Sequence, residues 1–220
     1  MAPEKRLALL DSDEGRILLA GIGGWLLYFL GILLIGFVLP GLYKLLTAIT
    51  VSHIIIGRVA GISVGFAMEA STTVVVAVNM LIETLLVLTI YPLFIMSWNK
   101  LHDIGRFEGW IAQARANAER YRPKIEKYGI IGLFLFVWFP FWMTGPVVGS
   151  MIGYLMGFRH RVTLSVVLAG TLIAIACWAF FLESMQAWAL ALHPEASWLV
   201  VVLVLFLVMI GFILRKWLKR

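Results

Sequence analysis

The stretch FVWFPFWMTGPVVGSMIGYLMGF, residues 136–158, is apolar enough for a membrane interior but carries helix-breaking residues in its middle. Proline removes a backbone donor and clashes with the preceding helical turn, and Pro140 and Pro146 here bracket Thr144 and Gly145. Such a break is tolerated at membrane depth only where protein or a watery cavity satisfies the freed backbone groups. The stretch predicts two half-helices joined by a turn, with a Pro-kinked ordinary span as the alternative.

Composition places the rest of the chain in a membrane as well. Hydrophobic residues make up 62% and charged residues 14%, with a mean hydropathy of +0.97, whereas soluble chains are about half apolar and a quarter charged. The net charge of +6 sits at the ends of apolar runs, so it indicates topology and not nucleic-acid binding. The single Cys177 excludes an internal disulfide or a cysteine metal site. We expect an all-α integral membrane protein, one domain over residues 1–220, without metal, cofactor or nucleic-acid partner.

Apolar runs of roughly twenty residues are long enough to cross a hydrocarbon core. Four candidate transmembrane helices follow, at residues 17–39, 72–98, 162–182 and 198–214. Residues 99–127 repeat apolar positions on one helical stripe with charges between them. This pattern predicts an amphipathic helix on the cytoplasmic membrane surface, with a docking face for a partner subunit as the alternative.

Positive charge sets the orientation. Seven Lys and Arg lie in residues 99–127, Arg159 and Arg161 flank His160, and residues 183–197 have none. By the positive-inside rule the basic segments are cytoplasmic, and His160 is interpreted as part of this topology signal. We expect a multi-pass protein of the inner (cytoplasmic) membrane with both termini in the cytoplasm.

The same orientation makes residues 128–158 a re-entrant hairpin, because the segments on both sides of it are cytoplasmic. By parity, residues 41–71 form a second re-entrant hairpin that enters from the opposite face. Each hairpin carries glycines at every fourth position, which lets helices approach closely. These are Gly57, Gly61 and Gly65 in the first hairpin and Gly149, Gly153 and Gly157 in the second. The matched triplets predict an inverted-topology repeat, by which many transporters build a midplane site.

Ionisable residues at membrane depth are costly and mark candidate functional sites. Glu69, Thr72, Asn79 and Glu83 follow one another at spacings of three, seven and four, which would place them on one helical face. A carboxyl group in low-dielectric surroundings can exchange a proton near neutral pH, as a proton-coupled carrier requires. The alternative is a glutamate held by Asn79 or Arg58 for packing alone.

The first hairpin holds two further polar residues. Arg58 could neutralise a glutamate or receive an anionic group, for which a guanidinium is well shaped, or it could extend to the membrane surface. His53 is interpreted as a hydrogen-bonded or interfacial histidine. The chain has no phosphate-binding glycine loop, zinc-ligand pattern or nucleophile elbow. We therefore expect no catalytic residues and no enzymatic activity.

The segment EKYGIIGLFLFVWFPFWMTGPVVGSMIGYLMGF resembles the small multidrug export family, which is related in architecture to the DedA (VTT-domain) superfamily. The similar features are the KYG-x-x-GLFLFV lead, Pro140, the Thr144 and Gly145 pair, and Gly149. The likeness extends over residues 57–180. It implies re-entrant hairpins from opposite sides and an export or lipid-carrier function. In the first hairpin, HIIIGRVAGISVG keeps an arginine but lacks the acidic residue and the proline of the family pattern.

Two functional hypotheses remain open from the sequence. The first is a proton-linked exporter or flippase of a small amphipathic or lipid-like substrate, acting among membrane lipids. Its substrate and proton pathway would comprise Glu83, Glu69, Arg58, Asn79, Pro140, Thr144 and Gly145. The second is a non-transporting accessory subunit that packs a larger membrane complex. Either protein could also form a homo-oligomer.

Overall fold

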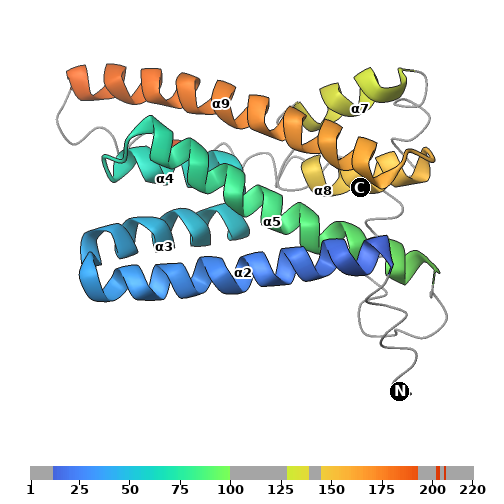
Figure 1. Ribbon diagram of the computed structural model, residues 1–220. Helices are drawn as coiled ribbons and strands as arrows, with labels where there is room; N and C mark the ends of the chain where they lie inside the picture. Colours follow the sequence, from blue (N-terminus) through green and yellow to red (C-terminus); the bar gives the residue numbers. More distant parts are fainter. Residues whose placement is uncertain (1–11, 100–127, 139–144, 193–201, 204–205, 207–220) are drawn as a thin grey trace, which may run out of the picture. The chain divides into compact units, whose positions relative to one another are not determined.

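The computed structural model describes residues 12–99, 128–138, 145–192, 202–203 and 206. Over these residues the chain is all-helical, with seven helices (Figure 1). They are α2 (Asp13–Val38), α3 (Pro40–Ile55), α4 (Arg58–Ala67), α5 (Thr72–Asn99), α7 (Gly129–Trp138), α8 (Gly145–Leu155) and α9 (His160–Leu192).

Three of these helices are long and apolar enough to cross a membrane. They cover Asp13–Val38, Thr72–Met96 and His160–Trp188. These are the same parts of the chain as the predicted spans at residues 17–39, 72–98 and 162–182, whose bounds in the membrane stay predictions. The all-α membrane fold is therefore confirmed. The predicted surface helix at 99–127 and most of the predicted span at 198–214 lie outside the described residues.

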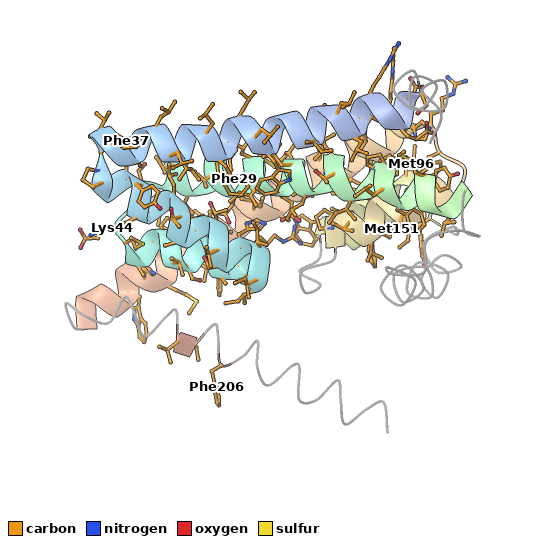
Figure 2. All side chains as sticks on the ribbon, turned by 90° about the horizontal axis from the view of Figure 1, so that it is seen from below. Phe29, Phe37, Lys44, Met96, Met151 and Phe206 are labelled. Carbon is orange, nitrogen blue, oxygen red and sulfur yellow. The ribbon has the colours of Figure 1, made fainter. Side chains whose placement is uncertain are left out.

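Helix α2 carries many large apolar side chains that the protein leaves uncovered, Phe29 and Phe37 among them (Figure 2). In water such a surface would drive aggregation, but in hydrocarbon it needs no cover. The opposite side of α2 packs on α5 through glycine. A Cβ placed on Gly21 would lie 2.9 Å from the backbone carbonyl of Leu88, so the two helices touch at backbone distance.

The first predicted hairpin consists of two helices, α3 and α4, that pack side by side (Figure 1). The chain breaks at Gly57, whose φ of 121° is a conformation that side-chain-bearing residues rarely adopt. Two backbone donors at the break are satisfied, because the N–H groups of Ile56 and Gly57 both donate to the Ser52 carbonyl, at 2.9 and 3.2 Å. The Gly57 carbonyl in turn accepts the Gly61 N–H at 3.1 Å, which starts α4.

The second predicted hairpin likewise consists of two packed helices, α7 and α8. Pro140 and Thr144, which were predicted to lie in its turn, fall outside the described residues. Gly145 and Pro146 were expected in the same turn, but they are the first two residues of α8. Proline is well accepted there because the first turn of a helix needs no N–H donor from it.

The turns after the two hairpins repeat each other at a spacing of 88 residues. After α4, the Ala70 N–H donates to the Gly65 carbonyl at 3.1 Å, and after α8 the Phe158 N–H donates to the Gly153 carbonyl at 3.1 Å. The two preceding N–H groups of each turn also bond in the same pattern. Helices α4 and α8 end, and α5 and α9 begin, at the same spacing. The hairpins with their following helices are thus a structural repeat, and their opposite orientation in the membrane stays a prediction.

This repeat corrects the pairing of the glycine triplets. The sequence pattern matched Gly57 with Gly149, but the structure matches it with Gly145, one helical turn earlier. Gly157 has no part in close helix packing: it lies in the turn after α8 with a φ of 77°. Its counterpart in the first repeat is Glu69, also at positive φ, 60°. A four-residue shift preserves a glycine pattern of period four, so spacing alone could not separate the two pairings.

The chain divides into two packing units. The α3–α4 unit comprises residues 32–82 and 175–220, and the α7–α8 unit comprises residues 1–31 and 83–174. The α3–α4 unit thus contains its own hairpin, the first part of α5 and the second part of α9. The α7–α8 unit contains its own hairpin, the second part of α5 and the first part of α9. The apolar core of each unit draws on these same three elements. The core of the α3–α4 unit contains Ile62 of α4, Val75 of α5 and Ile175 of α9. The core of the α7–α8 unit contains Ile152 of α8, Val167 of α9 and Val87 of α5.

We predict that Gly65→Ala and Gly153→Ala destabilise the protein to a similar extent. A Cβ on Gly65 would lie 2.8 Å from Val75 Cγ2, and one on Gly153 would lie 2.6 Å from Thr163 Cγ2. Overpacking of this kind costs about 1 to 3 kcal/mol. The measurement is thermal unfolding in detergent. The control is Gly23→Ala, where no described heavy atom lies within 4 Å of the new Cβ and the better helix propensity of alanine should stabilise by up to about 1 kcal/mol. A loss at only one of the two positions would contradict the shared packing.

Candidate functional site

Among its described residues, the α3–α4 unit buries six polar or charged side chains between otherwise apolar helices. They are Thr50 (4% exposed), His53 (3%), Arg58 (7%), Ser63 (0%), Asn79 (0%) and Gln186 (5%). Burying such groups costs free energy unless they are hydrogen-bonded, so their partners decide what this cluster can do.

His53 on α3 and Asn79 on α5 form a buried hydrogen bond of 2.7 Å between Nδ1 and Oδ1. The orientation of the amide is set by its nitrogen, which donates to the Val75 carbonyl at 2.8 Å. Asn79 Oδ1 is therefore the acceptor, and His53 Nδ1 carries the proton. Nε2 is then the ring nitrogen without a proton, which is a hydrogen-bond acceptor.

The absence of a side chain at Gly61 on α4 leaves the space that the His53 and Asn79 side chains occupy. A Cβ on Gly61 would lie 2.5 Å from Asn79 Oδ1 and 3.0 Å from His53 Cβ. Any side chain at this position would therefore displace the histidine or the asparagine. The glycine that the sequence assigned to helix packing also defines the polar pair.

Arg58 is the first residue of α4 and is buried. The sequence left open whether its guanidinium extends to the membrane surface, and its burial contradicts that alternative. A cation at a helix N-terminus also opposes the helix dipole. Burial of the charge and its position at a helix N-terminus are both unfavourable for the Arg58 guanidinium. An ionisable group kept in such a place is characteristic of a functional charge.

Glu83 lies on α5 one turn after Asn79 and is 4% exposed. The predicted common helix face therefore holds for Asn79 and Glu83. It is wrong for Glu69, which precedes α5 in the turn and is exposed. Thr72, the first residue of α5, instead donates a 2.6 Å hydrogen bond from its hydroxyl to Glu183 Oε1 on α9. A turn residue at positive φ breaks helical periodicity, and the sequence alone did not reveal it.

Of the three predicted site residues around the second hairpin, Pro140 and Thr144 lie outside the described residues. Gly145 is buried at the start of α8, where it matches Gly57 of the first repeat. The residue after it is Pro146, so the position of Arg58 carries no charge in the second repeat.

Comparing the two repeats shows which polar residues the packing does not need. Gly65 and Gly153 contact Ile49 and Leu133 on the preceding helix, which aligns α3 with α7 at a spacing of 84 residues.

At that spacing His53 corresponds to Val137, and at 88 residues Asn79 corresponds to Val167. Both valines are fully buried, and Gly149, the counterpart of Gly61, contacts Val137. The same close helix packing is therefore achieved with two valines in one repeat and with a His–Asn pair in the other. Glu83 similarly corresponds to Thr171.

Gln186 on α9 is a polar residue that the sequence analysis missed. With its amide turned so that both ends are satisfied, its nitrogen donates to the Phe66 carbonyl at 3.2 Å and its oxygen accepts from the Ala67 N–H at 3.3 Å. It thereby bonds the last turn of α4. The role depends on a partner more than a hundred residues away, so local sequence could not indicate it.

In the part of the chain that the structure describes, no group of His, Cys, Asp or Glu side chains could hold a metal ion. The candidate site is thus a set of buried hydrogen-bonding and ionisable groups on helices that border a backbone break. Such a site can hold a polar or charged part of a small molecule.

A family model described as "Putative small multi-drug export protein" matches residues 58–177, more than half of the chain. The chain belongs to this family. The small multi-drug export match begins at Arg58 and runs through α4, α5, α7 and α8 into α9, close to the range over which the sequence resembled the family. No curated protein and no solved structure matches the chain significantly.

We predict that Asn79→Val destabilises the fold whereas the double change His53→Val with Asn79→Val does not. The single change leaves the buried His53 Nδ1–H without its acceptor, which costs about 1 to 3 kcal/mol. The double change recreates the Val137 and Val167 pair of the other repeat. Thermal unfolding of the four proteins of this cycle in detergent measures the coupling. A double variant less stable than Asn79→Val would show that the polar pair is required for packing.

Proposed function

We propose that this member of the export family is a proton-linked exporter or flippase of small amphipathic or lipid-like molecules. The observation that supports the proposal best is the difference between the repeats. His53, Arg58, Asn79 and Glu83 occupy positions that the second repeat fills with Val137, Pro146, Val167 and Thr171. Because the scaffold packs without these polar groups, their retention in one repeat points to a function.

Glu83 is the proposed proton carrier. A buried carboxyl group is costly in its charged form, so its protonation couples readily to any movement that exposes it or brings a cation near. Asn79 lies one turn before it on α5 and accepts the hydrogen bond of His53 Nδ1. Arg58 supplies the buried positive charge that either a deprotonated carboxyl or an anionic substrate group would match.

The proposed substrate class rests on the composition of these helices. Apolar helices with a few buried polar groups suit a small molecule that has one polar or charged end and a hydrocarbon body. Pro140, Thr144 and Gly145 of the second predicted hairpin stay proposed pathway residues, because backbone groups at a helix break can bind substrates. Glu69 is exposed, and no transport role is proposed for it. The proposal includes no catalytic step and no cofactor.

We predict that Glu83→Gln abolishes proton-linked transport and leaves the fold intact. The amide keeps the shape and some of the hydrogen bonding of the carboxyl but cannot exchange a proton. The measurement is uptake of ethidium into proteoliposomes driven by an imposed pH gradient, together with the unfolding temperature. The matched control is Glu69→Gln, which changes an exposed carboxyl of the same chemistry and should keep full transport.

Full activity in Glu83→Gln would contradict the proton-carrier role. If the unaltered protein moves neither ethidium nor a fluorescent phospholipid, and native membranes yield it bound to a stoichiometric partner, the accessory-subunit function replaces the exporter.

We further propose that the chain lies in the inner membrane with both termini in the cytoplasm and two re-entrant hairpins. The basic residues of 99–127 and those beside His160 support this orientation.

The orientation predicts that Gln113→Cys and Arg159→Cys are labelled by a membrane-impermeant maleimide from the cytoplasmic side only. A Cys177→Ala background is needed because the native cysteine is exposed. Vesicles of inside-out and right-side-out orientation provide the two faces. Labelling of the two positions from opposite faces would replace the second hairpin by an ordinary span.

A further inference from the structure

The turns after α4 and α8 close with the same backbone hydrogen bonds, so the side chains that hold each turn can be compared directly. In the first repeat the N–H groups of residues 68–70 donate to carbonyls of residues 64–66, and in the second those of residues 156–158 donate to carbonyls of residues 152–154. All of these N···O distances lie between 2.9 and 3.1 Å. A difference in how easily the two turns open therefore points to the side chains around them.

Two side chains of α9 bind the end of α4 and the start of α5 by hydrogen bonds. The amide of Gln186 is buried, and it bonds the Phe66 carbonyl at 3.2 Å and the Ala67 N–H at 3.3 Å. One turn earlier on α9, the exposed Glu183 carboxylate accepts a 2.6 Å hydrogen bond from the hydroxyl of Thr72, the first residue of α5. The net free energy of such bonds is small, because bonds to water can replace them.

The turn after α8 is held by more apolar surface than the turn after α4. Of residues 68–70, Ala70 packs against the apolar core of the α3–α4 unit, and Glu69 is exposed. At the corresponding positions after α8, Met156 and Phe158 both pack against the core of the α7–α8 unit. Phenylalanine keeps far more apolar surface out of water than alanine does, so it resists opening more strongly.

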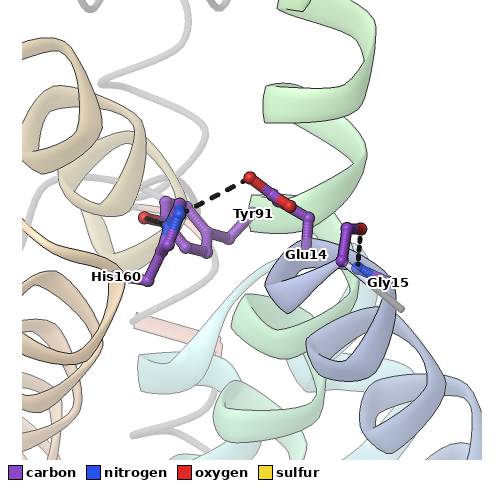
Figure 3. Close-up of polar contacts among 5 residues, drawn as sticks. Glu14, Gly15, Tyr91 and His160 are labelled. Atoms are coloured by element: carbon purple, nitrogen blue, oxygen red, sulfur yellow. Dashed lines mark hydrogen bonds and ion pairs between the residues drawn. The ribbon is translucent and has the colours of Figure 1, made fainter. Parts of the chain in front are cut away.

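The start of α9 in the second repeat is held by further contacts of His160, which the sequence had explained by topology alone. Figure 3 shows His160 between the Tyr91 hydroxyl, 2.9 Å from Nδ1, and the Glu14 carboxylate, 3.5 Å from Nε2. Tyr154 of α8 stacks on the imidazole ring, with centroids 6.3 Å apart and planes at 14°. His160 thus links α9 to α2, α5 and α8, whereas the hydrogen bond of its counterpart Thr72 links α5 to α9.

We propose that the turn between α4 and α5 is a gate, and that Glu183 and Gln186 are its latch. When the latch bonds exchange for bonds to water, the end of α4 is released from α9. The turn after α8 stays in place, because apolar packing and the ring stack hold it. In the predicted orientation the gate faces the outside, where an exporter releases its substrate. This transport role rests on the proposed function, whereas the local opening of the turn does not.

The other end of α4 is suited to be the hinge of this gate. The chain breaks there at Gly57, whose φ is 121°. Glycine accepts a wide range of backbone conformations, so it can absorb the change in φ and ψ that a hinge requires. With a hinge at its start and hydrogen bonds at its end, the ten-residue helix α4 can swing as one piece. Such a movement carries Arg58 and Gly61, and with them one side of the candidate site.

The test measures hydrogen exchange of both turns in the full-length protein in lipid nanodiscs. In the unaltered protein, the amides of residues 68–70 should exchange at least about tenfold faster than those of residues 156–158, after correction for sequence, because the gate opens locally. Gln186→Leu and Thr72→Val should each speed exchange at residues 68–70 about fivefold further, the effect of one hydrogen bond, and leave residues 156–158 unchanged. The matched control is Ser184→Ala, whose hydroxyl donates to the Phe180 carbonyl within α9 at 2.9 Å and which should change neither turn.

Equal exchange of the two turns in the unaltered protein would overturn the gate, and unchanged exchange in Gln186→Leu and Thr72→Val would overturn the latch. If Gln186→Leu does not fold, Thr72→Val decides alone. In the proteoliposome assay Gln186→Leu should raise the rate of ethidium uptake, because the weakened latch opens more often, whereas a purely structural role would lower it. A rate no higher than that of Ser184→Ala would remove the gate from transport. If the unaltered protein moves no ethidium, the exporter fails, and the exchange rates still decide whether the gate exists.

Discussion

A backbone that enters hydrocarbon must find every hydrogen-bond partner within the protein, and this constraint governs each place where the chain leaves a helix. At the break in the first hairpin, two successive N–H groups share the Ser52 carbonyl. The turns that follow α4 and α8 close with the same bonds at the same spacing, including Ala70 to Gly65 and Phe158 to Gly153. The two repeats are therefore most alike in these turns, while many of their side chains differ.

Glycine then determines how closely the helices approach. Lipid offers no hydrophobic drive for helices to associate, so contact area and close backbone approach take its place. Gly65 and Gly153 accept a neighbouring helix at distances where a methyl group would overlap. Beside Gly61, the space that a side chain would fill is occupied by the hydrogen-bonded side chains of His53 and Asn79. Packing and the candidate site thus depend on one type of residue.

The two repeats carry different polar residues on the same scaffold. Around the first hairpin, buried polar residues replace the valines that fill the second, and the charged Arg58 stands where the second has proline. At the starts of the long helices the difference is reversed, since the second repeat has the titratable His160 and the first has Thr72. The two repeats thus differ in where their polar side chains lie, although their turns and glycine contacts match.

Membrane insertion, the three described spans, both helical hairpins and the family were determined by the sequence itself, because hydrophobic length and helix breakers act locally and the bilayer fixes the scale. The burial of Asn79 and Glu83 agrees with one helix face, since periodicity within a helix is also local. The pairing of the glycines, the removal of Glu69 from that face and the partners of His53, Gln186 and His160 were decided only by the tertiary structure. Each depends on a positive-φ turn or on a contact between distant helices. A period-four pattern looks the same after a shift of four, and only the packed neighbours decide which register is occupied.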